Sequence, residues 1–131
     1  MTSIESLYYA IGEMAYAIAK VDGPVQREER ERFHKLVSEE LQHGEYLFDI
    51  SDIIFQILDK EKASAQMAYE FAMKQIRLNS HYVSPEIKDK FIRVMKKVAE
   101  AYAPISAEEQ KMMDRFNAEI KSIKGDPVFF D

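Results

Sequence analysis

A twelve-residue pattern occurs twice in this chain, and the two copies align with a constant offset of 80 residues. Residues 18–29 recur as residues 98–109, and four positions keep the same amino acid: Ala19, Pro24, Glu28 and Glu29. In each copy an apolar helix end is followed by a proline turn and then by an acidic helix start. The duplication predicts two equivalent helix–turn–helix hairpins in one closed globule, because its spacing is too long for a solenoid repeat.

Apolar residues recur at helical spacing along nearly the whole chain, and no alternation typical of a strand is present. The predicted helices cover residues 3–20, 27–42, 50–60, 62–78, 85–103 and 106–123. The fold class is therefore predicted as all-α, a compact bundle of about six helices with internal duplication. We expect one domain over residues 1–123. A short apolar tail over residues 124–131 either folds back on the bundle or docks into another chain.

The segment 62–78 is apolar over more than half of its circumference, so we expect it to be the central helix. We expect Asp49 or Ser51 to cap the helix before it. The residues expected to be buried in these two helices are Ile50, Ile53, Ile54, Ile57, Leu58, Met67, Tyr69, Phe71, Met73, Ile76 and Leu78. Tyr9 and Tyr16 lie beside the main apolar stripe of the first helix, where they either pack on helix 62–78 or form a patch for a partner.

Charge and composition exclude several functional classes. The chain carries 18 basic and 23 acidic residues, and its net charge of −5 disfavours nucleic-acid binding. It contains no cysteine, so disulfides and thiolate metal sites are excluded. The sequence shows no basic and apolar leader and no apolar run of about 18 residues, so we expect a cytoplasmic protein that does not insert into membranes.

The acidic residues of the repeat have a structural interpretation. Ser106 and Glu109 have the spacing of a capping box, and Glu29 occupies the equivalent position in the first copy. Acidic side chains in a first turn also interact favourably with the helix dipole. The pair Asp22-Gly23 suits a tight turn between helices. Capping and turn formation therefore account for these residues without a ligand.

The segment 19–25, followed by Glu28 and Glu29, resembles the TerB-like family named for tellurite resistance, and the resemblance extends over residues 4–123. It implies an all-helical fold with internal duplication, and a binding or scaffold role in stress complexes associated with membranes. Some members of the family bind divalent cations through the acidic residues of both repeats. By this resemblance the candidate metal ligands are Asp22, Glu28, Glu29, Glu108 and Glu109.

The second copy departs from the family pattern, because Tyr102 and Ala103 stand where the first copy has Asp22 and Gly23. A hard cation such as Ca²⁺ prefers six to eight oxygen ligands. The candidate set is therefore incomplete unless Asp126 or backbone carbonyls contribute.

Three functional classes follow from the sequence. The first is a non-enzymatic interaction or scaffold module, related to stress or tellurite resistance, that binds a protein partner or forms a homodimer. The second is a module that binds a divalent cation such as calcium weakly; otherwise no cofactor is expected. The third is an enzyme, but lone acids such as Glu13 and Glu70 have no partner in sequence, and the spacing of His34, His43 and His81 is not that of a zinc site. No catalytic residue is predicted.

Overall fold

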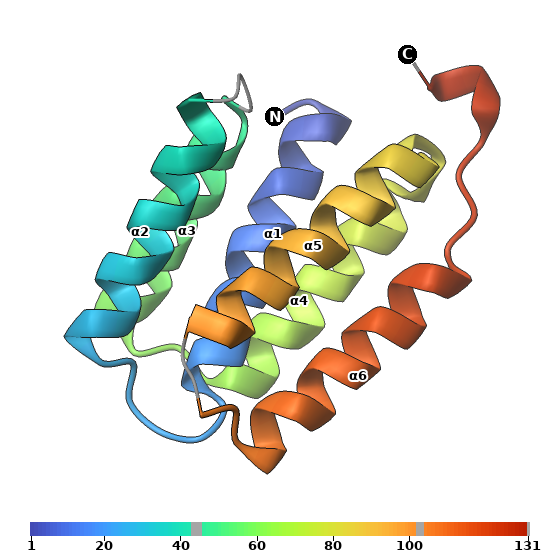
Figure 1. Cartoon of the computed structure of the whole chain (residues 1–131). Helices are drawn as coiled ribbons and strands as arrows, with labels where there is room; N and C mark the ends of the chain where they lie inside the picture. Colours follow the sequence, from blue (N-terminus) through green and yellow to red (C-terminus); the bar gives the residue numbers. More distant parts are fainter. Residues whose placement is uncertain (43–45, 102–103, 131) are drawn as a thin grey trace.

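The computed structural model describes residues 1–42, 46–101 and 104–130. Its elements in chain order are α1 (Ser3–Lys20), α2 (Arg27–Gln42), α3 (Phe48–Glu61), α4 (Ala65–Leu78), the 3-10 turn η1 (Ser80–Tyr82), α5 (Pro85–Ala101), α6 (Ala107–Ser122) and the 3-10 turn η2 (Pro127–Phe129). The described residues contain no strand, and the helices form a bundle (Figure 1). The predicted all-α class is confirmed.

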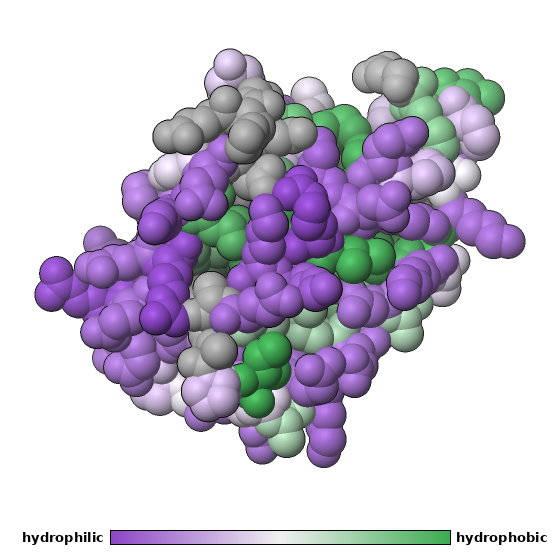
Figure 2. Space-filling model, viewed as in Figure 1, coloured by the Kyte–Doolittle hydropathy of each residue, from purple (hydrophilic) through white to green (hydrophobic). Residues whose placement is uncertain are grey.

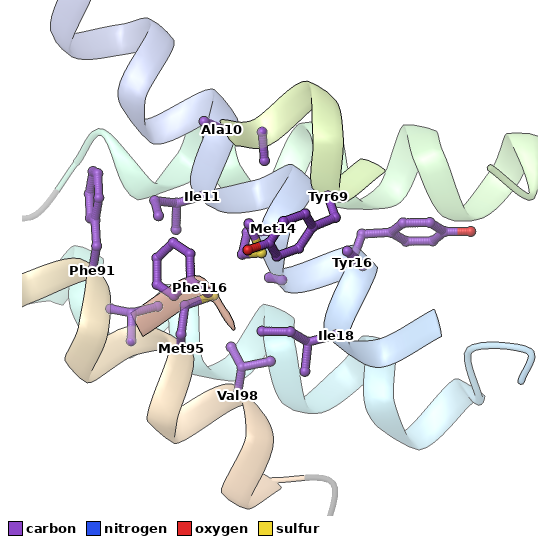
Figure 3. Packing of buried hydrophobic residues seen from close by; sticks show 14 of the residues in the cluster. Ala10, Ile11, Met14, Tyr16, Ile18, Tyr69, Phe91, Met95, Val98 and Phe116 are labelled. Carbon is purple, nitrogen blue, oxygen red and sulfur yellow. The ribbon is translucent and has the colours of Figure 1, made fainter. Parts of the chain in front are cut away.

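The central helix of the bundle is α1, and the prediction that helix 62–78 would be central is wrong. Every residue from Ala10 to Ala19 is buried, and α1 packs against α3, α4, α5 and α6. Figure 3 shows this arrangement, with Ile18 of α1 beside Val98 of α5 and Tyr16 pointing to another side. Small residues explain it, because the alanines and Gly12 of α1 allow neighbouring helices to approach closely on several sides.

The contact at Gly12 predicts a clear mutational result. An alanine Cβ there would lie 2.8 Å from Ser51 Cα, and closer still to Ser51 O and Ile54 Cγ2. Gly12→Ala is therefore expected to lower the free energy of unfolding by about 2 kcal/mol, because overpacking outweighs the higher helix propensity of alanine. Urea denaturation measures the change, and a gain in stability would contradict the close packing of α1 on α3.

Helix α4 is buried along one side only. Tyr69, Met73 and Ile76 are buried as predicted, together with the small residues Ala68 and Ala72 on the same side. Three other side chains that were expected in the core lie exposed on the opposite side: Met67, Phe71 and Leu78. The same correction applies to Ile53 and Ile57 of α3. Apolar residues extend around these helices, but no described helix covers the outer sides.

The starts of α3 and α4 differ from the prediction. Neither Asp49 nor Ser51 caps α3, which begins at Phe48 after Leu47 without a side-chain cap. The Ser51 hydroxyl instead donates to the Tyr8 carbonyl at 2.6 Å. Helix α4 begins at Ala65 rather than at residue 62, because Lys62 adopts the left-handed conformation (φ 55°) that ends α3.

The two tyrosines beside the α1 stripe have different surroundings. Tyr16 is fully buried, its ring meets that of Phe55 at 5.7 Å, and its hydroxyl donates to the Ala63 carbonyl at 2.7 Å. Tyr16 therefore packs on α3 and on the connection to α4. Tyr9 is only partly buried.

The C-terminal tail folds back onto the connection between α4 and α5. The Asp126 amide donates to the His81 carbonyl at 3.0 Å, and the Phe129 ring lies 5.1 Å from that of Tyr82. Of the two alternatives for the tail, the structure shows the folded-back arrangement for residues up to Phe130.

Candidate functional site

The connection from α1 to α2 and the described part of the second repeat, which starts at Pro104, lie side by side at one end of the bundle (Figure 1). The connection from α1 to α2 and the start of α6 line one pocket of about 370 Å³. Its lining residues are Asp22, Gly23, Pro24, Gln26, Glu28, Glu29, Arg32, Pro104 and Glu109. We call it the acidic pocket. The fold thus joins positions that are 80 residues apart in the sequence.

The glutamates of the acidic pocket cap the helices that they begin. Glu29 Oε1 accepts from the Gln26 amide at 2.8 Å, and Glu109 Oε1 accepts from the Ser106 amide at 3.2 Å. In the second copy the Ser106 hydroxyl also accepts from the Glu109 amide at 3.1 Å, which completes a capping box. The capping interpretation is confirmed for both glutamates, since each accepts from the backbone amide three residues before it at the start of its helix.

Capping leaves part of Glu109 unused. This side chain is only 3% exposed, and its Oε2 has no hydrogen-bond donor among the described residues. Burial raises the pKa of Glu109, and the nearby Asp22 carboxyl raises it further. Burial likewise raises the pKa of Glu29, with smaller contributions from Asp22 and Glu28. The pocket therefore concentrates negative charge where water is partly excluded.

Four of the five predicted ligands line the acidic pocket, namely Asp22, Glu28, Glu29 and Glu109. Glu108 does not, since it lies in a separate shallow pocket with Lys111 and Arg115. Asp126 caps η2 by accepting from the Val128 amide at 3.0 Å, so it supplies no ligand here. Within residues 1–42, 46–101 and 104–130, no group of three or more acidic or histidine side chains is arranged to hold a metal ion.

A second feature of the surface is apolar. Five large side chains that were predicted to be in the core are 45–70% exposed: Ile53 and Ile57 on α3, and Met67, Phe71 and Leu78 on α4. We call them the α3–α4 face. By contrast, the side of the molecule seen in Figure 2, over α2, α5 and α6, is mostly hydrophilic.

The two stripes of this face flank the same helix. Both α3 and α4 pack along α1, and a short turn at residues 62–64 joins them. On α4 the stripe lies opposite Tyr69, whose hydroxyl donates to Glu119 of α6 at 2.6 Å. The stripe therefore points away from α6 and from the buried side of α4.

Helix α1 carries a buried carboxyl group at Glu13. The side chain is 5% exposed, and its Oε1 has no hydrogen-bond partner among the described residues. Burial raises the pKa of Glu13 to about 7. Of the two lone acids noted in the sequence, only Glu13 is buried, because Glu70 is exposed and accepts from Gln66 at 2.8 Å.

Sequence reasoning missed the polar pairs that link separate helices. His34 Nδ1 lies 2.7 Å from Asp52 Oδ2, beside a shallow pocket of about 540 Å³ lined by Arg27 and Arg30 among others. Glu119 of α6 contacts both Tyr69 and Arg77 of α4. His81 contacts the Phe129 ring, and His43 lies outside the described residues. No local spacing signals such pairs, because their partners come from different elements.

Comparison with known proteins agrees with the architecture. In the part of the chain that the structure describes, no helix has the length and apolar character required to cross a membrane. Neither a curated protein nor a solved structure matches the chain. The family described as "Tellurite resistance protein TerB" matches residues 9–122, which is most of the sequence. This chain therefore belongs to the TerB family.

Proposed function

We propose that this chain is a non-enzymatic protein-interaction module, and that it binds its partner through the α3–α4 face. The observation that carries the proposal is that five large apolar side chains, each 45–70% exposed, lie on two consecutive helices that both pack along α1. Single exposed apolar residues are ordinary, but a group of them is typical of an interface. A role in a stress response, including tellurite resistance, is part of the proposal and rests on family membership alone.

The interaction is tested with a charge on the apolar stripe. Phe71→Asp places a carboxylate in the centre of the α4 stripe, where Phe71 is 50% exposed, so we expect the fold to persist and binding to fail. Ala118→Asp adds the same charge to an exposed position of α6 and serves as the control. Proteins captured from the host by the wild type and by Ala118→Asp, but lost with Phe71→Asp, are the expected result. Equal capture by all three forms would refute this surface.

A second candidate function is weak binding of a divalent cation in the acidic pocket, and it is favoured by one specific observation. Glu109 Oε2 is buried without a donor, and Asp22 from the other copy of the repeat lies beside it. Two carboxylates from different segments can share a hard cation such as Ca²⁺, with backbone oxygens and water completing its shell.

Titration of chelator-treated protein with Ca²⁺, Mg²⁺ and Zn²⁺ tests this site. With a dissociation constant of about 1 mM, 10 mM Ca²⁺ is expected to stabilise the fold by about 1.4 kcal/mol. Asp22→Asn combined with Glu109→Gln should abolish the effect, because both carboxylates are then neutral amides. The fold should persist, because glutamine can still accept from the Ser106 amide and preserve the helix cap. Glu108→Gln, outside the pocket, should bind as the wild type does. No heat and no shift in melting temperature would exclude the site.

A further inference from the structure

The carboxyl group of Glu13 lies in an unusual place for an acid. It is in the middle of α1, the most buried helix of the bundle, and the side chain is only 5% exposed. Burial raises the pKa of the Tyr9 hydroxyl, which lies one turn earlier on the same side of α1, and the carboxylates of Glu13 and of Glu61 in α3 raise it further. Gly12 and Tyr16 of α1 contact α3, and Ile18 lies beside Val98 of α5 (Figure 3). Glu13, about 100° from Gly12 around the helix, therefore lies next to the α3 contact and away from α5.

An ionised carboxylate in apolar surroundings is costly unless a cation or several donors satisfy it. The described residues offer Glu13 Oε1 no hydrogen-bond partner, and none of their ion pairs includes this side chain. Burial is the cause of the raised pKa of Glu13, and no cation among the described residues lowers it. A cation or hydrogen-bond donor for the Glu13 carboxylate would therefore have to come from a bound partner.

The spacing of the apolar residues on the α3–α4 face indicates which kind of partner could supply a cation to Glu13. On α4, Phe71 follows Met67 by four residues and Leu78 follows Phe71 by seven, while Ile57 follows Ile53 by four on α3. Two helical ridges of this kind, running along the same central helix, accept a third helix with apolar residues at similar spacing. A lysine or arginine on that helix can lay its aliphatic stem along apolar side chains while its charged end reaches a carboxylate.

We propose that the ligand of the α3–α4 face is an amphipathic helix that carries a lysine or arginine among its apolar residues, and that this basic side chain pairs with Glu13. The inference rests on the proposed interaction function and adds the chemistry of the partner to it. The apolar stripes supply the contact area, and the buried carboxylate selects helices with a basic residue at one position.

A display library of helical peptides of about 16 residues provides the test, with apolar residues held at one face and one central position randomised. We expect selection on the wild-type chain at pH 8 to enrich lysine and arginine at the randomised position. The selected lysine peptide is then measured against wild type, Glu13→Gln, Phe71→Asp and Ala118→Asp. Binding should weaken about 30-fold or more with Glu13→Gln, because one partner of a buried ion pair is lost. It should disappear with Phe71→Asp and stay unchanged with Ala118→Asp.

Replacing the lysine of the peptide by methionine completes a double-mutant cycle. The methionine peptide should bind Glu13→Gln better than the lysine peptide does, which is the signature of a direct pair. Enrichment of apolar or acidic residues, or a Glu13→Gln variant that binds the lysine peptide normally, overturns this inference but leaves the interaction function standing. Binding that survives Phe71→Asp overturns both. A selection without binders, or a second copy of the chain occupying the face in light scattering, also overturns the proposed peptide partner.

Discussion

Replacing Phe55 with alanine is expected to lower the free energy of unfolding by about 3–5 kcal/mol. The Phe55 side chain is fully buried, its ring stacks on Phe33 of α2 at 4.5 Å, and it meets Tyr16 of α1 edge-on at 5.7 Å. One ring therefore ties α1 and α2 to α3. Truncation would leave a cavity and remove two aromatic contacts, each worth about 0.5–1.5 kcal/mol beyond its buried area.

Phe71 is a matched control for this experiment, because it is also a phenylalanine within a helix but is 50% exposed. Phe71→Ala is expected to cost less than about 1 kcal/mol, since little packing is lost and alanine favours helix. Urea denaturation of both variants, with the slope of the transition checked against wild type, gives the comparison. Similar losses for the two variants would contradict the assignment of Phe71 to the surface.

Glu13→Gln is expected to stabilise the protein at pH 8 by about 2–3 kcal/mol, an effect of unusual sign for a buried substitution. Burial raises the pKa of Glu13 from 4.5 to about 7, so the folded chain holds this proton more tightly than the unfolded chain does. Stability from this group is therefore fully present below about pH 4.5 and falls as the pH rises to about 7. Above pH 7 the carboxylate is ionised in both states, and the penalty is constant.

The amide of the variant has no charge to bury, so the pH dependence contributed by this position should disappear. Denaturation of wild type and Glu13→Gln at pH 5 and pH 8 measures the effect, which should be small at pH 5 and largest at pH 8. Glu70→Gln, on the exposed side of α4, should change stability by less than about 0.5 kcal/mol at either pH. A Glu13→Gln variant that is less stable at pH 8 would show that the carboxylate is satisfied in the folded state.

The same carboxyl group connects stability and the proposed function. The buried carboxylate lowers the stability of the free chain. A bound cationic side chain would offset the free-energy cost of burying this charge. Stability–function conflicts of this kind are common where a surface must remain open for a ligand. The prediction for Glu13→Gln is therefore a more stable chain that binds its partner less well.

Local features of the sequence were sufficient for the helices and for the capped turns. The predicted ranges 3–20 and 27–42 agree with α1 and α2, and Glu29 and Glu109 cap as their spacing predicts. These features depend on interactions between residues three or four positions apart, or on a proline that ends a helix, so neighbouring residues alone determine them. The TerB resemblance followed from the same local pattern and its return after 80 residues.

Only the tertiary structure decided which apolar surfaces are covered and which acids meet. Phe71 was among the residues predicted to be buried and Phe55 was not, yet Phe71 is exposed and Phe55 is buried. The meeting of Asp22 with Glu109, and the burial of Glu13, likewise depend on where the neighbouring helices lie. The physical reason is that periodicity shows which side of a helix is apolar but not whether another helix covers it. Whether a side chain is buried depends on both helices of a packed pair. Which helices pack together is fixed by close approach at positions such as Gly12.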